Sequence, residues 1–402
     1  MPKVSVLLAN YNSEKHLHEA IESVLEQTYQ DFEFVIIDDA STDSSRKVIE
    51  NYHDKRIKKY YAEKNRNIAY SLNLALSMAS GEYIARIDSD DVWELNKLET
   101  QVQYMDNHPE CGACFTKVNI IDAYSNIAND VYGEYFQLFN NAENRSQKEW
   151  LRFFFYQGNC LCHPSVVIRR SALERIGEYY HLAYVPAEDY ELWTRIVMKY
   201  PIHILEDKLV RYRWEETANK ISGKTDGRIY AFPNIMMLTR KKIMDNISNE
   251  EFVRYFNEDF INPESESQEE LECEKAHILL RCSGDNANFL GLEKYEQILG
   301  DEKLLNILEE KMDFSISEYY NNYRFRNFDF FDELGRAKEN IRKLEAEIEE
   351  KQRYLESKIM ETEIKQREIE HLQFLVDEVM SSTSWKVTGP LRKAVRMLKR
   401  RK

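Results

Sequence analysis

The chain has 402 residues, of which 43% are hydrophobic and 31% are charged. This length and composition argue against a single compact core and predict one large domain with appendages, or two to three domains of ordinary size. No run approaches the ~18 apolar residues that a membrane-spanning helix needs. The N-terminus passes from Met1 into an apolar run without a cationic, cleavable leader, so we expect a cytoplasmic protein.

The net charge of −15 is distributed unevenly along the chain. Residues 383–402 contain eight Lys and Arg and no acid, which leaves a net charge of −23 on residues 1–382. Because this acidic body repels phosphate backbones, we expect no nucleic acid among the partners. The six cysteines lie in apolar or strand-like contexts, which favours reduced thiols in the core over disulfides.

The N-terminal part of the chain alternates between predicted strands and helices. Apolar runs predict strands over 4–8, 32–37, 57–61 and 83–87. A helix through Leu25 follows the first strand with Asn12-Ser13 as its cap, a helix to about Tyr52 follows the second with Ser41-Thr42-Asp43 as its cap, and a third spans 70–79. This alternation predicts an α/β fold with a mainly parallel, twisted sheet covered by helices on both faces.

Carboxylates follow two of these predicted strands at the point where each strand ends. Asp38-Asp39 ends the second strand, and Asp88, Asp90 and Asp91 end the fourth. Ligands of open α/β sheets bind outside the carboxyl ends of the strands. So much negative charge there favours a divalent cation, a donor such as a nucleobase N–H, or sugar hydroxyls. For the second group, the alternative is an acidic turn before a helix that begins at Val92-Trp93.

The sequence beyond residue 110 is less regular. Strand-like runs at 112–118 and 166–168 lie on either side of an aromatic stretch at 150–156. Glu188-Asp189 then open an amphipathic helix. A favourable interaction with the helix dipole is sufficient to explain acids at a helix start, so their role is open at this point.

The C-terminal part of the chain is predicted to be helical. Residues 226–330 read as an accessory helical region. Within 331–380, one seam of a coiled coil repeats every seven residues, at Leu334, Ile341, Ile348, Leu355, Thr362, Ile369 and Val376. The companion seam contains Lys351, Lys358 and Lys365, so a homo-oligomer and a solvated single helix are both open. In 381–402, Leu391, Val395 and Leu398 share a helical face among cations, which suits an anionic membrane; a disordered basic tail is the alternative.

Five segments, in this order, resemble the family 2 glycosyltransferases of GT-A fold. They are Val6–Asn12, Ser23–Tyr29, Ile37–Asp43, Gly81–Asp91 and Glu188–Trp193, within a resemblance that covers about residues 2–222. The resemblance implies a GT-A domain over 1–225 with a Rossmann-like nucleotide-binding half. It also implies transfer of a sugar from a nucleotide-diphosphate sugar to an acceptor hydroxyl, with inversion at the anomeric carbon.

The same resemblance implies residues that bind the donor. Asp39 would bind the base or ribose, and Asn10 and Tyr11 would line the nucleoside pocket. Asn73 and Asp88 would complete the donor site. Near these positions the chain departs from the family in two places, since Asn67 stands where many members have Gly, and Leu72 stands where many have Arg.

Metal binding and catalysis are implied by two further acidic segments. Asp88-Ser89-Asp90 looks like the family's DxD motif, so Asp88 and chiefly Asp90 would hold Mg²⁺ or Mn²⁺ against the diphosphate. Asp189 would accept the proton of the acceptor hydroxyl, with Glu188 as the alternative base. Many members have a His after Tyr-Arg near the end of the domain, whereas this chain has Trp214, so no third metal ligand is assigned.

The sequence therefore predicts a metal-dependent glycosyltransferase that acts in the synthesis of cell-surface polysaccharide or lipid-linked glycan. Its partners would be a nucleotide sugar, a glycan or lipid-linked acceptor and the inner face of the cell membrane. Residues 384–392 also resemble a tail found on bacterial surface-polysaccharide glycosyltransferases. The alternatives are a nucleotidyltransferase and a non-catalytic coiled-coil scaffold. Against the first, this sequence lacks the Gly-rich phosphate loop that nucleotidyl transfer favours.

Overall fold

The computed structural model describes residues 1–177, 179–215, 231–282, 287–317, 319–320 and 329–399. The chain divides into two compact units, Met1–Asn321 and Asn322–Lys402. The predicted border between the transferase domain and the helical region, at residue 225, lies outside the described residues.

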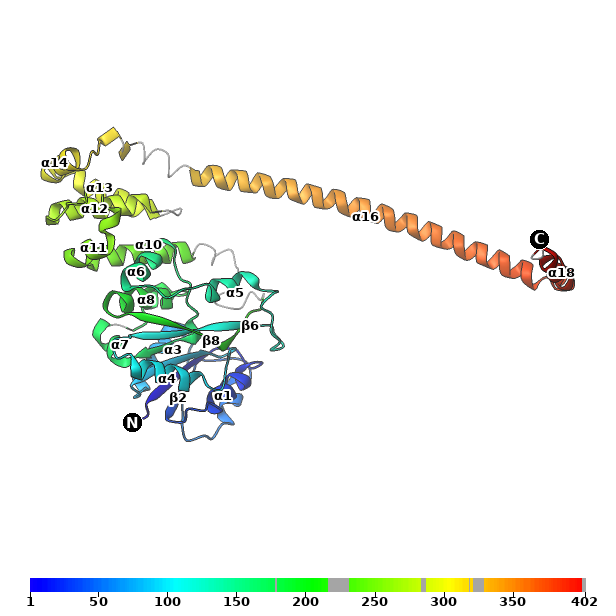
Figure 1. The fold of residues 1–402 in the computed structure, drawn as a ribbon, viewed down its shortest axis with the longest axis horizontal. Helices are drawn as coiled ribbons and strands as arrows, with labels where there is room; N and C mark the ends of the chain where they lie inside the picture. The colour runs from blue at the N-terminus through cyan, green and yellow to red at the C-terminus, as the bar shows by residue number, and fades with distance from the viewer. Residues whose placement is uncertain (178, 216–230, 283–286, 318, 321–328, 400–402) are drawn as a thin grey trace. The chain divides into compact units, whose positions relative to one another are not determined.

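The first unit is built on one mixed, mainly parallel sheet (Figure 1). Its strands lie in the order β3-β2-β1-β4-β7-β6-β8-β5, and their bounds are Val4–Asn10 (β1), Phe32–Asp38 (β2), Ile57–Tyr61 (β3), Tyr83–Asp88 (β4), Val92–Trp93 (β5), Ala113–Ile121 (β6), Val167–Arg169 (β7) and Ile202–Arg213 (β8). Strands β3, β2, β1 and β4 are parallel to one another, as are β6 and β8. Strand β7 pairs antiparallel with β4 and β6, and β5 with β8. The predicted fold class is confirmed.

Helices cover both faces of this sheet. They are Leu17–Leu25 (α1), Ser45–Glu50 (α2), Ile68–Met78 (α3), Lys97–Asn107 (α4), Gly133–Asn140 (α5), Gln147–Tyr156 (α6), Arg170–Ile176 (α7) and Glu188–Lys199 (α8). Because successive side chains of a strand point to opposite faces, β1 contributes to two hydrophobic cores. Leu7 packs in the core that contains α3, α6 and α8, whereas Val6 and Leu8 pack in the core that contains α1 and α4.

The first helix begins later than the sequence predicts. Asn12 and Ser13 do not cap it, because α1 starts at Leu17 and the residue before it is His16, which makes no side-chain capping bond. Asn12 instead adopts a left-handed backbone with φ of 53°, and its Oδ1 accepts a hydrogen bond from the backbone N–H of Thr42 at 2.8 Å. This bond ties the loop after β1 to the loop after β2.

Two further helix starts differ from the prediction. Val92-Trp93 do not begin a helix; they form β5, which pairs with β8, and the next helix starts at Lys97. Pairing with a distant strand outweighs the local helical pattern here. Helix α3 begins at Ile68 rather than residue 70, because the Asn67 side chain caps it by accepting from the Ile68 N–H.

A close contact fixes the start of β4 against β1. Gly81, two residues before β4, leaves no room for a side chain, since a Cβ there would lie 2.5 Å from the backbone nitrogen of Ser5. The Gly81 N–H donates to Ser5 Oγ at 2.8 Å, and that hydroxyl donates to Glu33 Oε1 of β2 at 2.6 Å. A glycine is therefore required where the two strands converge.

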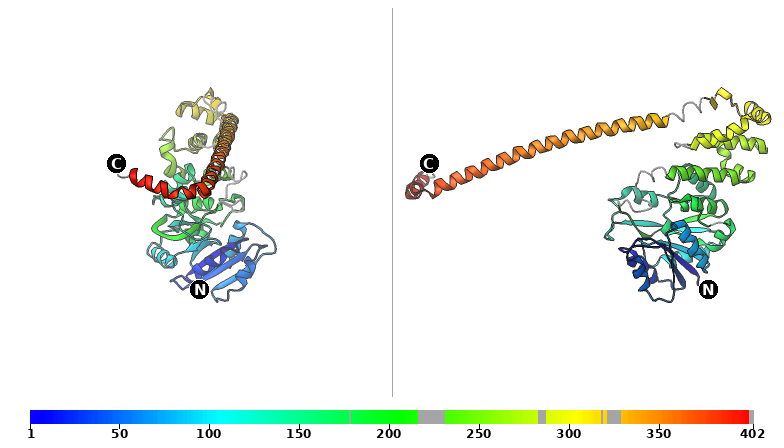
Figure 2. Two further views of the ribbon diagram at one scale, coloured as in Figure 1. Left: turned by 90° about the vertical axis from the view of Figure 1, so that its right-hand side faces the viewer. Right: turned by 180° about the vertical axis from the view of Figure 1, so that it is seen from behind.

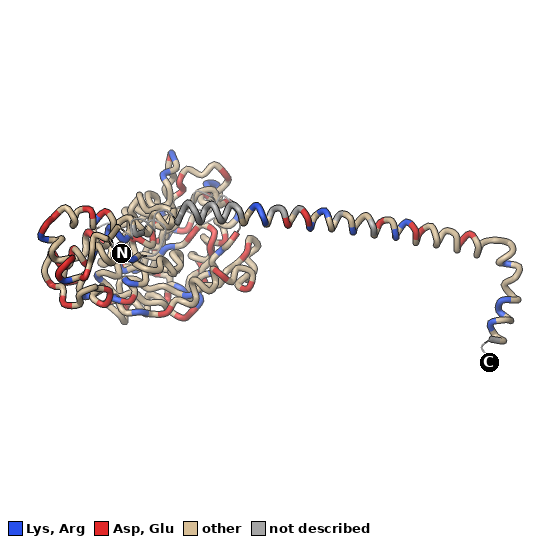
Figure 3. The backbone as a smooth tube through the Cα atoms, turned by 90° about the horizontal axis from the view of Figure 1, so that it is seen from above, with Lys and Arg blue, Asp and Glu red and all other residues tan. Residues whose placement is uncertain are grey.

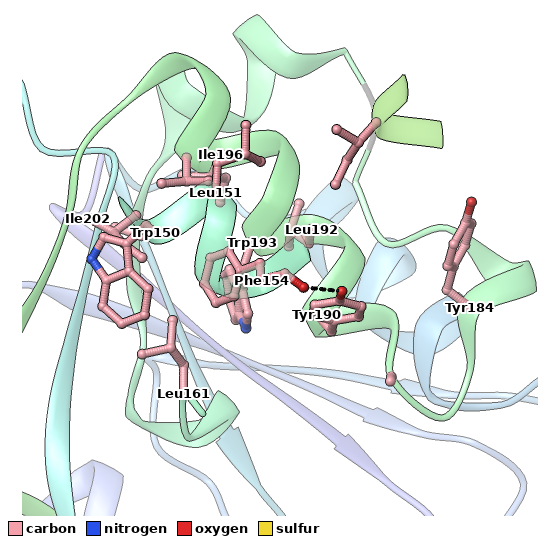
Figure 4. Close-up of a cluster of buried hydrophobic side chains, with 14 of the residues drawn as sticks. Trp150, Leu151, Phe154, Leu161, Tyr184, Tyr190, Leu192, Trp193, Ile196 and Ile202 are labelled. Carbon is pink, nitrogen blue, oxygen red and sulfur yellow. Dashed lines mark hydrogen bonds between the residues drawn. The ribbon is translucent and has the colours of Figure 1, made fainter. Parts of the chain in front are cut away.

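Five helices follow the sheet in the described part of the first unit. They are Ala231–Asn246 (α10), Asn249–Phe256 (α11), Gln268–Arg281 (α12), Ala287–Leu299 (α13) and Glu302–Lys311 (α14). Helices α10 and α11 share a core with α6 and α8, while α12, α13 and α14 enclose a third core. Figure 4 shows part of the shared core, where the buried Tyr190 hydroxyl donates to the Phe154 carbonyl at 2.6 Å. The predicted accessory region is thus packed on the transferase domain.

The second unit is helical throughout its described part. Helix α16, Asp329–Ser381, is continuous over 53 residues (Figure 2). It is followed by α17, Thr383–Val387, and by α18, Gly389–Lys399. No helix in the described ranges is both long enough and apolar enough to cross a membrane.

Candidate active site

Three neighbouring parallel strands end in polar residues at one edge of the sheet. In the strand registers, Asn10 of β1 lies opposite Asp38 of β2, and Ala9 of β1 lies opposite Asp88 of β4. The two carboxylate groups that the sequence places at strand ends therefore lie on either side of the end of β1. This is the edge at which open α/β sheets bind ligands.

Asn10 holds the ends of β1 and β2 together. Its side chain is buried, and Nδ2 donates to Asp38 Oδ1 at 2.8 Å and to Ser41 Oγ at 3.0 Å. The Asp39 N–H also donates to the Asn10 carbonyl at 2.8 Å. These bonds position the end of β1 beside Asp38, and the donor contact expected of Asn10 stays a prediction.

Asp39 faces the loop before α3. Both of its carboxylate oxygens accept from the backbone N–H of Arg66, at 3.0 and 3.1 Å. Burial raises the pKa of Asp39, and nearby Asp38 adds to the shift, while bonds from the Arg66 and Asn67 N–H groups oppose it. Tyr11, by contrast, is 49% exposed at the end of β1, where its ring is accessible to a ligand.

Asp88, the first carboxylate of the DxD motif, is held by Arg86 of the same strand. Residues two apart on a strand share a face, and the buried guanidinium forms two parallel bonds to this carboxylate, one of them from Nη1 to Oδ2 at 2.8 Å. Arg86 was not among the expected site residues. Its charge therefore lies next to both oxygens of Asp88.

The loop that carries Asp90 is braced by Arg213, the last residue of β8. The Arg213 N–H donates to Asp91 Oδ1 at 2.7 Å, and its Nε donates to the Asp90 carbonyl at 2.7 Å. Its Nη1 donates to the Asp122 carbonyl and its Nη2 to Glu19 Oε2, each at 2.7 Å. The buried guanidinium therefore fixes the backbone of the DxD loop, while the Asp90 side chain is half-buried.

Asp189 and Glu188 form the N-terminus of α8. Asp189 is half-buried, and its Oδ2 accepts from Asn159 Nδ2 at 2.9 Å. Burial raises the pKa of Asp189, although bonds from the Tyr190 backbone and the Asn159 amide and the charge of Arg86 oppose the shift. Glu188 is only 4% exposed, and burial and the adjacent Asp189 raise its pKa to about 7. Of the two acids, Asp189 is the more accessible to an acceptor.

Asn73 bonds to the backbone of the segment before α8. Its Nδ2 donates to the Tyr180 carbonyl at 2.8 Å, and its Oδ1 accepts from the Tyr180 N–H at 3.0 Å. This pair of hydrogen bonds joins α3 to the segment before α8, and the donor contact expected of Asn73 stays a prediction. Tyr180 continues the network through its hydroxyl, which lies 2.8 Å from His163 Nε2.

The family departures have local explanations. Asn67 has φ of 75° and ψ of 163°, a conformation that glycine adopts most easily. Leu72 is fully buried in the core, so the absent Arg is replaced by packing. Trp214 stacks on Tyr135, with ring centroids 3.7 Å apart.

The described residues do not include a group of three His, Cys, Asp or Glu side chains that could hold a metal ion. The six cysteines are free and buried in the structure. The expectation from the sequence, that the cysteines are reduced thiols in the core, agrees with their burial and their lack of disulfide bonds.

Comparison with known proteins defines the family. Residues 5–177 match the family model described as glycosyl transferase family 2. An uncharacterized glycosyltransferase of Methanocaldococcus jannaschii is 32% identical over 236 residues, which cover 58% of this chain and 77% of the relative. The chain belongs to glycosyltransferase family 2. A putative glycosyltransferase of Bacillus subtilis, EpsE, is 31% identical over 56% of this chain and 74% of its own length.

Relatives with named substrates and a solved structure extend this comparison. The family 2 glycosyltransferase described here is 30% identical to the Escherichia coli UDP-Glc:alpha-D-GlcNAc-diphosphoundecaprenol beta-1,3-glucosyltransferase WfgD, over 55% of this chain and 79% of the relative. Residues 1–349 of S. aureus TarS, solved with UDP-GlcNAc, share the fold with a TM-score of 0.50 and 19% identity, over 82% of this chain and 92% of that one. The predictions of a glycosyltransferase and of a GT-A-like fold are confirmed, and the two alternatives are not favoured.

Proposed function

We propose that this glycosyltransferase moves a sugar from a UDP-sugar to a hydroxyl of a lipid-linked glycan, with inversion at the anomeric carbon. The observation that carries the proposal is the half-buried Asp189 carboxylate, held by Asn159 at the start of α8. The names of two E. coli relatives, WfgD and WfaP, support a UDP-sugar donor and a diphosphoundecaprenol-linked acceptor. TarS, which shares the fold, was solved with UDP-GlcNAc.

Donor binding is assigned to the edge formed by β1 and β2. Asp39 would accept hydrogen bonds from the base or ribose, and it is preoriented by the Arg66 N–H. The exposed ring of Tyr11 would pack against the nucleoside. Asn10 stabilises this site by holding the end of β1 against Asp38 of β2.

Asp189 acts as the general base. The acceptor O–H proton moves to its carboxylate as the oxygen forms a bond to the anomeric carbon, and the bond from that carbon to the diphosphate oxygen breaks on the opposite face. Burial raises the pKa of Asp189, which strengthens it as a base. Asn159 fixes the orientation of the carboxylate through its bond to Oδ2. Glu188, buried behind it, is not assigned a proton-transfer step.

The carboxylate ligands fit Mg²⁺ or Mn²⁺, which bind hard oxygen ligands and are often held by one or two carboxylates together with substrate phosphates. Asp90 would hold the ion, with Asp88 beside it as a ligand shared with Arg86. The ion, when bound, would stabilise negative charge on the leaving diphosphate. Arg213 serves this site by keeping the Asp90 backbone in place.

The base assignment is tested by Asp189→Asn. This variant should bind UDP-GlcNAc or UDP-Glc as the parent does, because the proposed donor contacts Tyr11 and Asp39 follow β1 and β2, whereas Asp189 lies on α8. Transfer to a GlcNAc-diphospho-lipid acceptor should fall by about 10²–10⁴-fold, the usual contribution of a general base. Binding is measured by calorimetry and transfer by release of UDP.

Glu206→Gln is the matched control for that experiment. Glu206 is an exposed carboxylate on β8 that pairs with Lys117 on β6, so the change should leave transfer intact. If Asp189→Asn turns over as fast as Glu206→Gln, the assignment of Asp189 as the base is wrong.

We also propose that α18 contacts an anionic membrane. Its apolar residues Leu391, Val395 and Leu398 lie three or four positions apart and are at least half exposed. The cations of the helix are Arg392, Lys393, Arg396 and Lys399, and Arg392 covers the ring of Trp385 at 3.5 Å from the centroid. An amphipathic cationic helix with an aromatic neighbour is typical of proteins that bind at a lipid surface.

A further inference from the structure

Helix α16 presents apolar side chains that nothing in the described residues covers. Ile348, Leu355, Ile359 and Ile369 are each about half exposed, between 49% and 60%. A long helix in water normally buries such a row of residues against another helix. Within the described part of the second unit, no segment packs on this part of α16.

The central part of α16 has a different heptad register from the one read by counting from Leu334. A row with spacings of three and four residues runs through Ile348, Gln352, Leu355, Ile359, Thr362, Gln366 and Ile369. A surface hollow of about 400 Å³ lies on this face, lined by Leu355, Ile359, Thr362 and Gln366 together with two charged residues at its flanks. A recess between such positions is what receives a side chain of a neighbouring helix in a coiled coil.

This register moves the lysines out of the seam. With Ile359 and Gln366 at the a positions, Lys358 and Lys365 occupy the flanking g positions, and Glu363 and Glu370 occupy the e positions on the other flank. A register counted from Leu334 places these lysines in the companion seam, where they would oppose pairing. Figure 3 shows that charges of both signs occur along the described part of α16.

We propose that a second copy of this chain pairs with α16 as a parallel, in-register coiled coil. In a parallel pair, each g residue faces the e residue five positions later on the other helix. Lys358 would then face the partner's Glu363, and Lys365 would face the partner's Glu370. In an antiparallel pair, g faces g and e faces e, so Lys would face Lys and Glu would face Glu. The charge pattern therefore favours a second copy of this chain as the partner and a parallel orientation of the two helices.

The glutamines of the seam select the same arrangement. In a parallel pair, Gln352 and Gln366 each face their own counterpart, and two side-chain amides can hydrogen-bond to each other. In an antiparallel pair, a positions face d positions, which places each glutamine against an apolar or Thr side chain. Buried amides without partners are costly, so the antiparallel arrangement is disfavoured a second time.

Disulfide trapping of the full chain tests this orientation. Thr362→Cys puts a thiol at a d position, and only a parallel pair brings two such thiols close enough to bond. Mild oxidation should give a covalent dimer of twice the chain mass. The six native cysteines are buried, so the parent chain should give none. Ser357→Cys, on the opposite face of α16, is the matched control, and trapping of Thr362→Cys no better than this control overturns the proposal.

Charge inversion tests the partner without any covalent bond. Sedimentation of the full chain should show a dimer for the parent, and monomers for Lys358→Glu/Lys365→Glu and for Glu363→Lys/Glu370→Lys. An equal mixture of the two variants should recover the dimer, because the inverted charges complement each other. A parent that is monomeric at the highest soluble concentration, or variants that dimerise as well as the parent, overturn the proposal. Asp189→Asn should still dimerise, so this result is independent of the proposed catalysis.

Discussion

Glu188 is a buried acid next to the proposed base. Burial, together with the adjacent Asp189, raises its pKa from the ordinary 4.5 to about 7. Between these two pH values the unfolded chain has released this proton while the folded chain retains it. The unfolded state therefore binds fewer protons there, and the free energy of unfolding falls as pH rises from about 4.5 to about 7.

Glu188→Gln removes this titration. The variant should have a higher free energy of unfolding than the parent above pH 7, where the parent buries a charge, and the difference should shrink as pH falls through the folded pKa. Thermal unfolding at a series of pH values measures the effect. Glu206→Gln, at an exposed carboxylate, should show no such trend, and a difference for Glu188→Gln that is independent of pH would contradict the assignment.

At the level of elements, β8 supports the DxD loop although it follows that loop by more than a hundred residues. The side chain of its last residue, Arg213, is fully buried and donates to the Asp90 and Asp122 carbonyls. Arg213→Met would leave those carbonyls without their donor. We expect a loss of about 2–4 kcal/mol in the free energy of unfolding, as for a broken buried hydrogen-bond network to a charged group.

The same substitution should weaken binding of Mn²⁺, because the backbone that positions Asp90 loses its support. Arg211→Met is the matched control, since Arg211 lies on the same strand and forms a partly exposed pair with Glu94. Such pairs contribute about 0–1 kcal/mol. Chemical denaturation and Mn²⁺ titration compare the two variants, and equal effects would refute a special role for Arg213.

The elements differ in how far the sequence predicts them. The apolar runs predict the parallel strands, and the Asp residues that follow them predict the carboxylates at the strand ends. The predicted helix starts differ from the structure where a bond to a distant residue determines the local conformation, as at Asn12. The roles of Asn73 and Arg213 were not predictable in the same way. Asn73 bonds to Tyr180, 107 residues away, and no local pattern signals such a bond. One apolar seam of α16 alone does not identify its companion, so the sequence leaves the register of a pair open.

On the scale of the whole molecule, parallel pairing and membrane contact reinforce each other. A parallel coiled coil would place two copies of α18 at the same end of the paired helices. A single short anchor binds a membrane weakly and reversibly, whereas two linked anchors bind with a higher effective concentration. Pairing would therefore convert a marginal contact into a stable one.

Vesicle flotation tests this coupling. The full chain should bind vesicles that contain anionic lipid, and Leu391→Ser/Leu398→Ser should lose this binding because the apolar face of α18 is removed. Met397→Ser changes an equally exposed residue off that face and should bind as the parent does. Lys358→Glu/Lys365→Glu, expected to be monomeric, should bind at least tenfold more weakly than the parent. Equal binding of all variants would show that α18 is not the anchor.

The glycine before β4 determines more than a tight turn. Because Gly81 lies against Ser5, the start of β4 is fixed along β1. The parallel register of the two strands then determines the position of Asp88 opposite Ala9. Five residues of strand, about 17 Å, separate Tyr83 from Asp88. A shift of β4 along β1 at this turn would therefore move the carboxylates of the DxD motif by the same amount, although the turn lies at the opposite end of the strand from them.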